Sequence, residues 1–307
     1  MAGGSAGRVL ARAAGRGWAG EGRLPGPEET LALLEAAVVH REGALLALSK
    51  PPGLPVCGGG GELSLAALLP ALSRRLGLPA ELHVVKAPGR ESSGLVLLSG
   101  CRRATERLHR FFARARRGGR CPATYRAVTV GVPAEPEGRV CVGLRRQRLG
   151  DAVLVVPVAA PSRGSLARKE VKKTQTSYRV LGAAGGCALL ELQPKTAFPG
   201  QLLAHLALLL CPALGDHEGC AGVGRVLGQP FLLPPAAAAA RPRAQVLDEE
   251  LERRLQLAPG PRRGRLPLHL HLQELALPAA VLTAPPPPFF LRTLRLLGLP
   301  GAPPPPH

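Results

Sequence analysis

Residues 102–117 carry a dense group of charged side chains, with seven arginines against one acid, Glu106. A guanidinium group is always ionised and binds a phosphate through two parallel hydrogen bonds. Apolar side chains recur in this segment at helical spacing, namely Leu108, Phe111, Phe112 and Ala115. The spacing predicts an amphipathic helix with a phosphate-binding face, for which a solvated helix face is the alternative. The arginines assigned to this face are Arg102, Arg103, Arg107, Arg110, Arg114 and Arg117.

The overall charge of the chain agrees with a polyanionic partner. The 307 residues include 40 Lys and Arg against 21 Asp and Glu, which gives a formal net charge of +19. An enzyme that acts on small neutral molecules has no use for this excess, whereas a nucleic acid binds to it. A drift of composition toward arginine is the alternative explanation. No stretch approaches the ~20 consecutive apolar residues of a membrane span.

Other patterns that carry chemistry in proteins fail in this chain. Residues 222–228, GVGRVLG, lack the glycine spacing of a dinucleotide loop, and Ser92-Ser93-Gly94 is not the GxSxG elbow of a hydrolase. His269 and His271 alternate as on one face of a strand, and we interpret them as structural histidines rather than metal ligands. The seven cysteines form no CxxC pair, which argues against zinc sites and disulfides and favours a reducing compartment. We therefore expect no metal.

The N-terminal segment, residues 1–25, has the pattern of a mitochondrial presequence. It holds no acid before Glu21, and Arg8, Arg12 and Arg16 recur every four positions, on one face of a helix. Mitochondrial import depends on a basic amphipathic helix of this kind rather than on a long apolar segment. We expect this segment to direct the protein to the mitochondrial matrix.

Strands and helices intermix along the rest of the chain without a regular βαβ rhythm, which favours an α+β fold. Helices are predicted at 30–39, 64–76, 102–117 and 201–210, and strands at 44–48, 94–99, 125–132 and 153–158. A hairpin is predicted at 176–192, an edge strand at 268–277 and a Pro/Ala loop at 234–243. We interpret 50–56, KPPGLPV, as a rigid loop and Gly58–Gly61 as a flexible linker. The expected organisation is one domain at 30–280 and an extended Pro-rich tail at 281–307.

Six segments, in the same order, resemble the RluA-type pseudouridine synthase family over about residues 36–278. VVHREGALLALSKPPGLPV resembles a family strand with its KPxGxPV loop, and VVKAPGRESSGLVLLS stands where the family has its catalytic loop, HRLDRxTSGLLLLA. The series continues with ATYRAVTVG, TQTSYRVL, CALLELQPKTAFPGQLLAHLALLLCPALGD and LHLQEL. The resemblance implies the pseudouridine synthase fold, a mixed and mostly antiparallel β-sheet with flanking helices and an RNA-binding cleft.

The resemblance also implies an activity, the isomerisation of uridine to pseudouridine in RNA without a cofactor. Such an enzyme must take the target base out of its stack before it reaches the glycosidic bond. In this context the arginine face at 102–117 is expected to hold the RNA backbone. The residues that the resemblance places in the pocket for the base and its RNA are Arg90, Ser93, Gly94, Tyr125, Gln201 and His205.

The same positions show where the chain departs from the family. Gly89 stands where the family has its catalytic aspartate, Leu203 where it has the arginine that pairs with that aspartate, and Ala123 where it has a lysine. The reaction needs a carboxylate that attacks or stabilises the sugar, and glycine offers neither. The two losses are coherent, because a buried arginine without its carboxylate is costly. Glu91 is the nearest other carboxylate on the loop.

Three functions stay open on the sequence. The first is an RNA uridine isomerase whose chemistry has moved to other residues. The second is a catalytically inactive RNA-binding factor in mitochondrial RNA metabolism or ribosome assembly, and the third is a scaffold without affinity for RNA. Binding of mitochondrial mRNA or rRNA is common to the first two, and protein partners in RNA granules or ribosome assembly are compatible with both. We therefore expect an RNA-binding protein first of all.

Overall fold

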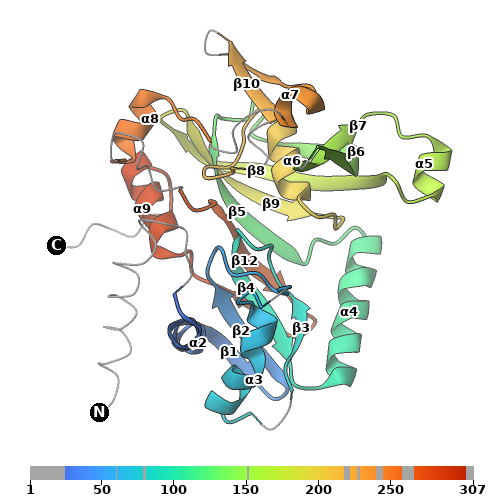
Figure 1. Ribbon diagram of the computed structural model, residues 1–307, viewed down its shortest axis with the longest axis vertical. Coiled ribbons are helices and arrows are strands. Elements are labelled where there is room, and N and C mark those ends of the chain that lie inside the picture. The colour runs from blue at the N-terminus through green and yellow to red at the C-terminus, as the bar shows by residue number, and fades with distance from the viewer. Residues whose placement is uncertain are drawn as a thin grey trace. The chain divides into compact units, whose positions relative to one another are not determined.

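The computed structural model describes residues 25–59, 61–78, 81–150, 152–217, 222–226, 229–239, 245–257 and 266–301, so the expected presequence lies outside the described residues except for Pro25. The described residues form two compact units, whose elements are labelled in Figure 1. Unit 1 comprises the described residues within 25–123, 266–267 and His271–Leu291. Unit 2 comprises the described residues within 124–257, Leu268–Leu270 and 292–301. The chain passes from one unit to the other within β5 (Ala123–Val130), between Pro267 and Leu268, within β12 (Leu270–Ala276) and within α9 (Pro288–Leu297).

Unit 1 is a mixed sheet with helices packed on it. Its helices are α2 (Pro27–Ala36), α3 (Leu65–Arg75) and α4 (Arg102–Arg117). Its strands are β1 (Val38–Glu42), β2 (Leu45–Lys50), β3 (His83–Lys86), β4 (Ser93–Ser99), β12 (Leu270–Ala276) and β13 (Val281–Thr283). Strands β2 and β3 both pair antiparallel with β4, β1 with β2 and β13 with β12. Strand β12 pairs parallel with β4, where His271 lies opposite Ser93.

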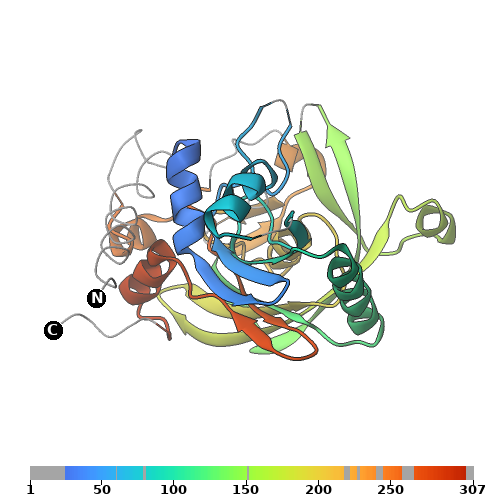
Figure 2. The ribbon, with the colours of Figure 1, turned by 90° about the horizontal axis from the view of Figure 1, so that it is seen from below.

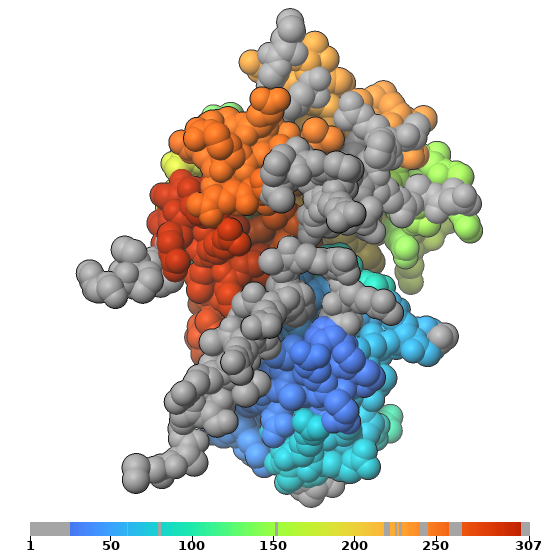
Figure 3. Space-filling model, turned by 60° about the vertical axis from the view of Figure 1, so that its left-hand side comes forward, coloured from blue at the N-terminus to red at the C-terminus, as the bar shows by residue number. Residues whose placement is uncertain are grey.

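The core of unit 1 lies between α2, α3 and one face of β2 and β4. Leu46 and Leu48 lie on that face, directly opposite Leu98 and Val96, and all four are fully or almost fully buried. Helix α3 begins after Ser64, whose hydroxyl accepts a hydrogen bond from a backbone N–H of the first turn. Helix α2 packs on α3 and lies at the surface of unit 1, in blue in Figure 3.

Helix α4 has the bounds that the sequence predicts. Phe112 and Ala115 are buried and Leu108 and Phe111 half-buried, and the helix contacts β3 and β4. The six arginines assigned to RNA binding are all exposed. The apolar stripe is therefore used for packing, and the arginine face is left at the surface.

Unit 2 contains an antiparallel sheet in the order β5-β9-β8-β6-β7. These strands are β5 (Ala123–Val130), β6 (Glu137–Leu149), β7 (Ala152–Val158), β8 (Lys172–Ala184) and β9 (Cys187–Pro194). The helices are α5 (Arg163–Ala167), α6 (Gln201–Leu208), α7 (Pro235–Ala239) and α8 (Glu249–Arg254), and β10 (Val223–Val226) pairs with β11 (Gln229–Leu232). Helix α6 contacts β6, β7 and β8, so it covers one face of this sheet (Figure 1).

The structure confirms the α+β class and most predicted elements, and it corrects three expectations about the fold. Residues 268–277 do not form an edge strand, because β12 has β4 on one side and β13 on the other. The expected loop at 234–243 contains the short helix α7. Residues 281–301, expected in an extended tail, form β13 and α9 (Pro288–Leu297), which begins at a proline because the first turn needs no N–H donor. Strands β1, β3, β6, β10 and β11 and helices α5 and α8 were not predicted.

Within the described residues, no disulfide bond is formed by Cys57, Cys101, Cys121, Cys141, Cys187 or Cys211. Within the described ranges, no helix is long and apolar enough to cross a membrane.

Candidate functional site

The loop between β3 and β4 holds the position that the resemblance assigns to the catalytic aspartate. Gly89 is exposed there, and a Cβ atom added to it would meet no atom within 4 Å. Its φ lies outside the left-handed region that favours glycine. Nothing in the local structure therefore requires glycine at this position, and a carboxylate side chain would fit.

Lys50 fixes the conformation of this loop. Its ammonium group donates to the backbone carbonyls of Pro51, Leu54 and Arg90 at 2.8, 2.9 and 3.0 Å. Burial lowers the pKa of Lys50 to about 7, while three carbonyl acceptors favour the ammonium form, which alone has three protons to donate. Sequence reasoning missed Lys50, although the alternation of LLALSK places it on the same face as the buried Leu46 and Leu48.

Arg90, one of the residues assigned to the pocket, is held between two carboxylates. Its Nη1 lies 2.7 Å from Glu62 Oε1 and its Nε 3.2 Å from Glu91 Oε1. Glu62 reaches Arg90 from a tight turn, because a Cβ at Gly58 would lie 2.7 Å from the Glu62 carbonyl oxygen and Gly61 has a φ of +86°. The described glycines of 58–61 thus belong to a turn that presents Glu62, and the flexibility expected of them stays a prediction.

Ser93 and Gly94 are fixed by β12. Ser93 Oγ lies 2.9 Å from His271 Nδ1, and His271 Nε2 lies 3.1 Å from the carbonyl oxygen of Ala284. A carbonyl only accepts, so Nε2 carries the proton and the Ser93 hydroxyl donates to Nδ1. Burial lowers the pKa of His271 to about 4, so the ring is neutral. A Cβ at Gly94, where φ is +116°, would overlap the backbone of Leu272.

His269, just before β12, and His271 on β12 are both held by hydrogen bonds, as expected for structural residues. His269 Nε2 lies 2.8 Å from Thr293 Oγ1, and His271 bonds to Ser93 and Ala284 as described above. No cluster of three or more potential metal ligands occurs among the described residues.

Tyr125 lies on β5 in unit 2 with 8% of its surface exposed. Burial raises the pKa of its hydroxyl to about 12, so the phenol stays protonated at neutral pH. The pairing of β5 with β9 and of β9 with β8 places Tyr125 on the same face as Thr176 and Tyr178. This is also the face that α6 covers, since His205 of α6 bonds to Thr176.

Gln201 and His205 form a closed network beneath α6. Gln201 Nε2 donates to the hydroxyl of Thr176 at 3.0 Å and to the backbone oxygen of Gln175 at 3.1 Å. His205 Nδ1 lies 2.8 Å from Thr176 Oγ1, and His205 Nε2 lies 2.9 Å from Thr174 Oγ1. Because Thr174 donates its own proton to a backbone carbonyl, it must accept from Nε2, and Nδ1 then accepts from Thr176. Burial lowers the pKa of His205 to about 4, which agrees with a neutral ring.

The structure thus brings the assigned residues together in two groups. Arg90, Ser93 and Gly94 lie beside Gly89 at the start of β4 in unit 1, whereas Tyr125, Gln201 and His205 share one face of the sheet in unit 2. Leu203, at the position of the family arginine, is half-buried on α6. Ala123 is buried at the start of β5. The role of these residues toward RNA stays a prediction.

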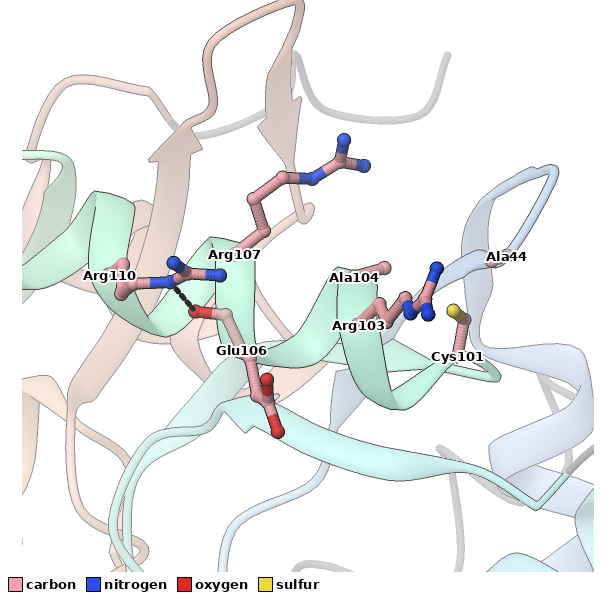
Figure 4. Close-up of a pocket in the computed structure, with 7 residues that line it drawn as sticks. All are labelled: Ala44, Cys101, Arg103, Ala104, Glu106, Arg107 and Arg110. Atoms are coloured by element: carbon pink, nitrogen blue, oxygen red, sulfur yellow. Dashed lines mark hydrogen bonds between the residues drawn. The ribbon is translucent and has the colours of Figure 1, made fainter.

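A hollow beside α4 is lined by arginine side chains (Figure 4). Its lining residues are Ala44, Cys101, Arg103, Ala104, Glu106, Arg107 and Arg110. Arg110 Nε donates to the backbone oxygen of Glu106 at 3.4 Å, and the guanidinium groups of Arg103 and Arg107 lie at the surface. Hydrogen bonds from the backbone N–H groups of Ala104 and Arg103 lower the pKa of the Cys101 thiol. The hollow combines a positive rim with the N-terminus of a helix, an arrangement suited to phosphate.

Comparison with known proteins identifies the family. Residues 44–208 match the model of the RNA pseudouridylate synthase family, which is more than half of the chain. The chain belongs to this family, as the RluA-type motifs indicated. It is 51% identical over 280 residues to human "Mitochondrial mRNA pseudouridine synthase RPUSD3", covering 89% of this chain and 79% of that protein. The mouse protein of the same name is 50% identical over 282 residues, covering 89% of this chain and 81% of that protein.

More distant relatives agree with this assignment. "Pseudouridylate synthase RPUSD4, mitochondrial" of Xenopus tropicalis is 34% identical over 287 residues, covering 87% of this chain and 82% of that protein. The solved structure of human RNA pseudouridylate synthase domain containing 4 superposes with a TM-score of 0.68 at 28% identity, covering 89% of this chain and 97% of that one. The expected pseudouridine synthase fold, mixed and mostly antiparallel with flanking helices, is confirmed.

Proposed function

We propose that this protein binds mitochondrial RNA, either mRNA or rRNA, and does not form pseudouridine by the family's aspartate chemistry. The observation that carries the binding is the exposed arginine face of α4 with its hollow. The observation that carries the loss is Gly89, an exposed position without a carboxylate in a loop that Lys50 still holds in place. Names of the relatives support mitochondrial RNA as the ligand.

The proposal includes the mitochondrial matrix as the place of action. The acid-free segment with Arg8, Arg12 and Arg16 supports import, as do the names of the relatives. Protein partners in RNA granules or in ribosome assembly are part of the same proposal, because a binding factor without turnover must act through what it recruits.

A salt titration tests the binding. If arginines neutralise about 4–6 phosphates, log K falls with log salt at a slope of about −3 to −5. Replacing Arg107 and Arg110 by Glu should weaken binding and flatten the slope. The matched control replaces Arg41 and Arg74 by Glu, and these two are also exposed arginines of unit 1. Binding that is indifferent to salt, or equally weakened by both pairs, contradicts the proposal.

The second candidate function is uridine isomerisation with relocated chemistry. It is favoured by two relatives at about half identity whose names describe mitochondrial mRNA pseudouridine synthases, and by Tyr125, which the family resemblance places in the pocket for the base. Purified protein is incubated with uridine-containing RNA, and pseudouridine is measured by mass spectrometry. Turnover that Tyr125→Phe abolishes would replace our proposal with this one.

A further inference from the structure

The segment from β6 to the start of β8 is a second strongly basic region. Residues 137–173 contain nine Lys and Arg against three Asp and Glu. All nine basic side chains are exposed, namely Arg139, Arg145, Arg146, Arg148, Arg163, Arg168, Lys169, Lys172 and Lys173. Nothing in the family motifs or in the proposed role of α4 accounts for this charge.

The strands β6 and β7 extend beyond their neighbour β8 as a two-stranded ribbon. Strand β8 pairs with β6 only as far as Lys172 opposite Leu144, whereas β6 and β7 stay paired through Leu149. Figure 2 shows these green strands running on past the rest of the unit-2 sheet. The ribbon presents arginines on both of its faces, because successive side chains of a strand alternate.

One face of the ribbon continues the face that carries Tyr125. Directly paired residues share a face, so Leu144, Arg146 and Arg148 lie on the side of Lys172 and Thr176. The pairings of β8 with β9 and of β9 with β5 extend this side to Tyr125 without a break in register between them.

The position of α6 agrees with this assignment. A Cβ at Gly200, just before α6, would lie 3.0 Å from Cγ2 of Val155, the residue opposite Arg146. Arg139 and Arg145 lie on the opposite face of the same strand.

The arginines of the Tyr125 face are available for a ligand. Arg146 and Arg148 make no hydrogen bond or ion pair within the part of the chain that the structure describes. Arg145, on the other face, donates to Gln147 at 2.9 Å. Val153 lies opposite Arg148 with 49% of its surface exposed and adds an apolar contact beside the two charges. Guanidinium groups next to an apolar side chain suit phosphates with an adjacent sugar or base.

We propose that the Tyr125 face of the β6–β7 ribbon, with Arg146 and Arg148, binds the backbone of the RNA whose target base lies at Tyr125. This inference rests on the proposed RNA binding and adds a contact surface in unit 2 that is separate from α4. RNA is favoured over an acidic protein or a lipid surface because the charges lie on the face of Tyr125, the residue that the family resemblance assigns to the target base.

The experiment compares two pairs of substitutions on one strand. Arg146→Glu with Arg148→Glu changes the Tyr125 face, and Arg139→Glu with Arg145→Glu makes the same change of charge on the opposite face. Affinity for a labelled uridine-rich RNA is measured by fluorescence anisotropy over a range of salt. We expect the first pair to weaken binding about tenfold and to reduce the salt slope by about 1.4 to 1.8, since each phosphate contact contributes about 0.7 to 0.9. The control pair should change affinity by less than about threefold.

Two results overturn the inference. One is an equal effect of the two pairs, which would reflect net charge alone. The other is unchanged RNA binding by the first pair together with lost binding to vesicles of anionic lipid, which would assign the surface to a membrane. A thermal melt of each variant shows whether it is folded. The milder pair Arg146→Gln with Arg148→Gln repeats the test without adding negative charge. Failure of the proposed function looks different, because the unaltered protein would then not bind RNA at all.

Discussion

The loop before β4 in unit 1 and the network beneath α6 in unit 2 both follow family motifs, yet they keep their residues for different reasons. In the loop, the backbone is held by Lys50 and by the packing of Gly94 on β12, while a Cβ atom added at position 89 would meet no atom within 4 Å. Beneath α6, the side chains of Gln201 and His205 are themselves the structure, because each bonds to threonines of β8.

This difference teaches which kept residues are informative about activity. The side chain at the position that the resemblance assigns to the catalytic aspartate can change without unfolding the loop. The loss of Gln201 or His205 would instead leave buried polar groups without partners. Retention of the α6 network is therefore explained by stability alone. The absence of a carboxylate at Gly89 is the observation that bears on catalysis.

The largest expected effect comes from restoring the missing charge pair. We predict that the unaltered protein makes no pseudouridine, since removing a nucleophile elsewhere costs on the order of a million-fold in rate. Gly89→Asp alone should stay inactive, because the position that the family resemblance assigns to the arginine partner is Leu203. Gly89→Asp with Leu203→Arg should recover measurable turnover, since an arginine both orients and stabilises the carboxylate. Mass spectrometry of RNA treated with each protein measures the pseudouridine formed. Activity of the Gly89→Asp variant alone would contradict the expected need for an arginine at position 203.

The second prediction contrasts two glycines of the same segment. Gly94→Ala should destabilise unit 1 by about 4 kcal/mol or more, because the methyl group would overlap β12 at a φ that alanine resists. Gly89→Ala should be neutral or stabilising by about 0.5 kcal/mol, because it restricts the unfolded chain without a clash. Urea unfolding of both variants checks this. Similar losses at the two positions would show that position 89 is constrained after all.

The smallest expected effect is a pH dependence of the α6 network. The folded pKa of His205 is lowered to about 4, below the unfolded value near 6.5, so the folded state favours the neutral ring. The contribution of the neutral His205 ring to the free energy of unfolding is complete above about pH 6.5. It is lost as the pH falls toward 4, and the total loss is up to about 3 kcal/mol. His205→Gln should make the loss of stability between these values shallower. Both tyrosines, Tyr125 and Tyr178, lie in unit 2, so tyrosine absorbance during urea unfolding measures the stability of that unit at each pH. Identical pH profiles for the two proteins would refute the assignment.

Helices and strands with a strong local sequence pattern were predicted well. Strands whose place depends on the adjacent strands of the sheet were not. Helix α4 and the hairpin of β8 and β9 follow from apolar periodicity and from Gly185-Gly186. Strand β6 was missed because much of it is exposed and rich in arginine, so its alternation does not mark a buried face. Strand β12 was taken for an edge, since alternation of side chains does not tell how many strands flank a segment.

The sequence by itself determined the family, the arginine face of α4 and the absence of a carboxylate at Gly89, because motif order, helical spacing and residue identity are local properties. Only the tertiary structure decided what holds these residues. It joined Ser93 to His271 across the chain, turned Glu62 onto Arg90, and placed Arg146 on the face of Tyr125. These relations depend on strand order and register, which arise from packing between segments far apart in the chain and leave no mark on the residues between them.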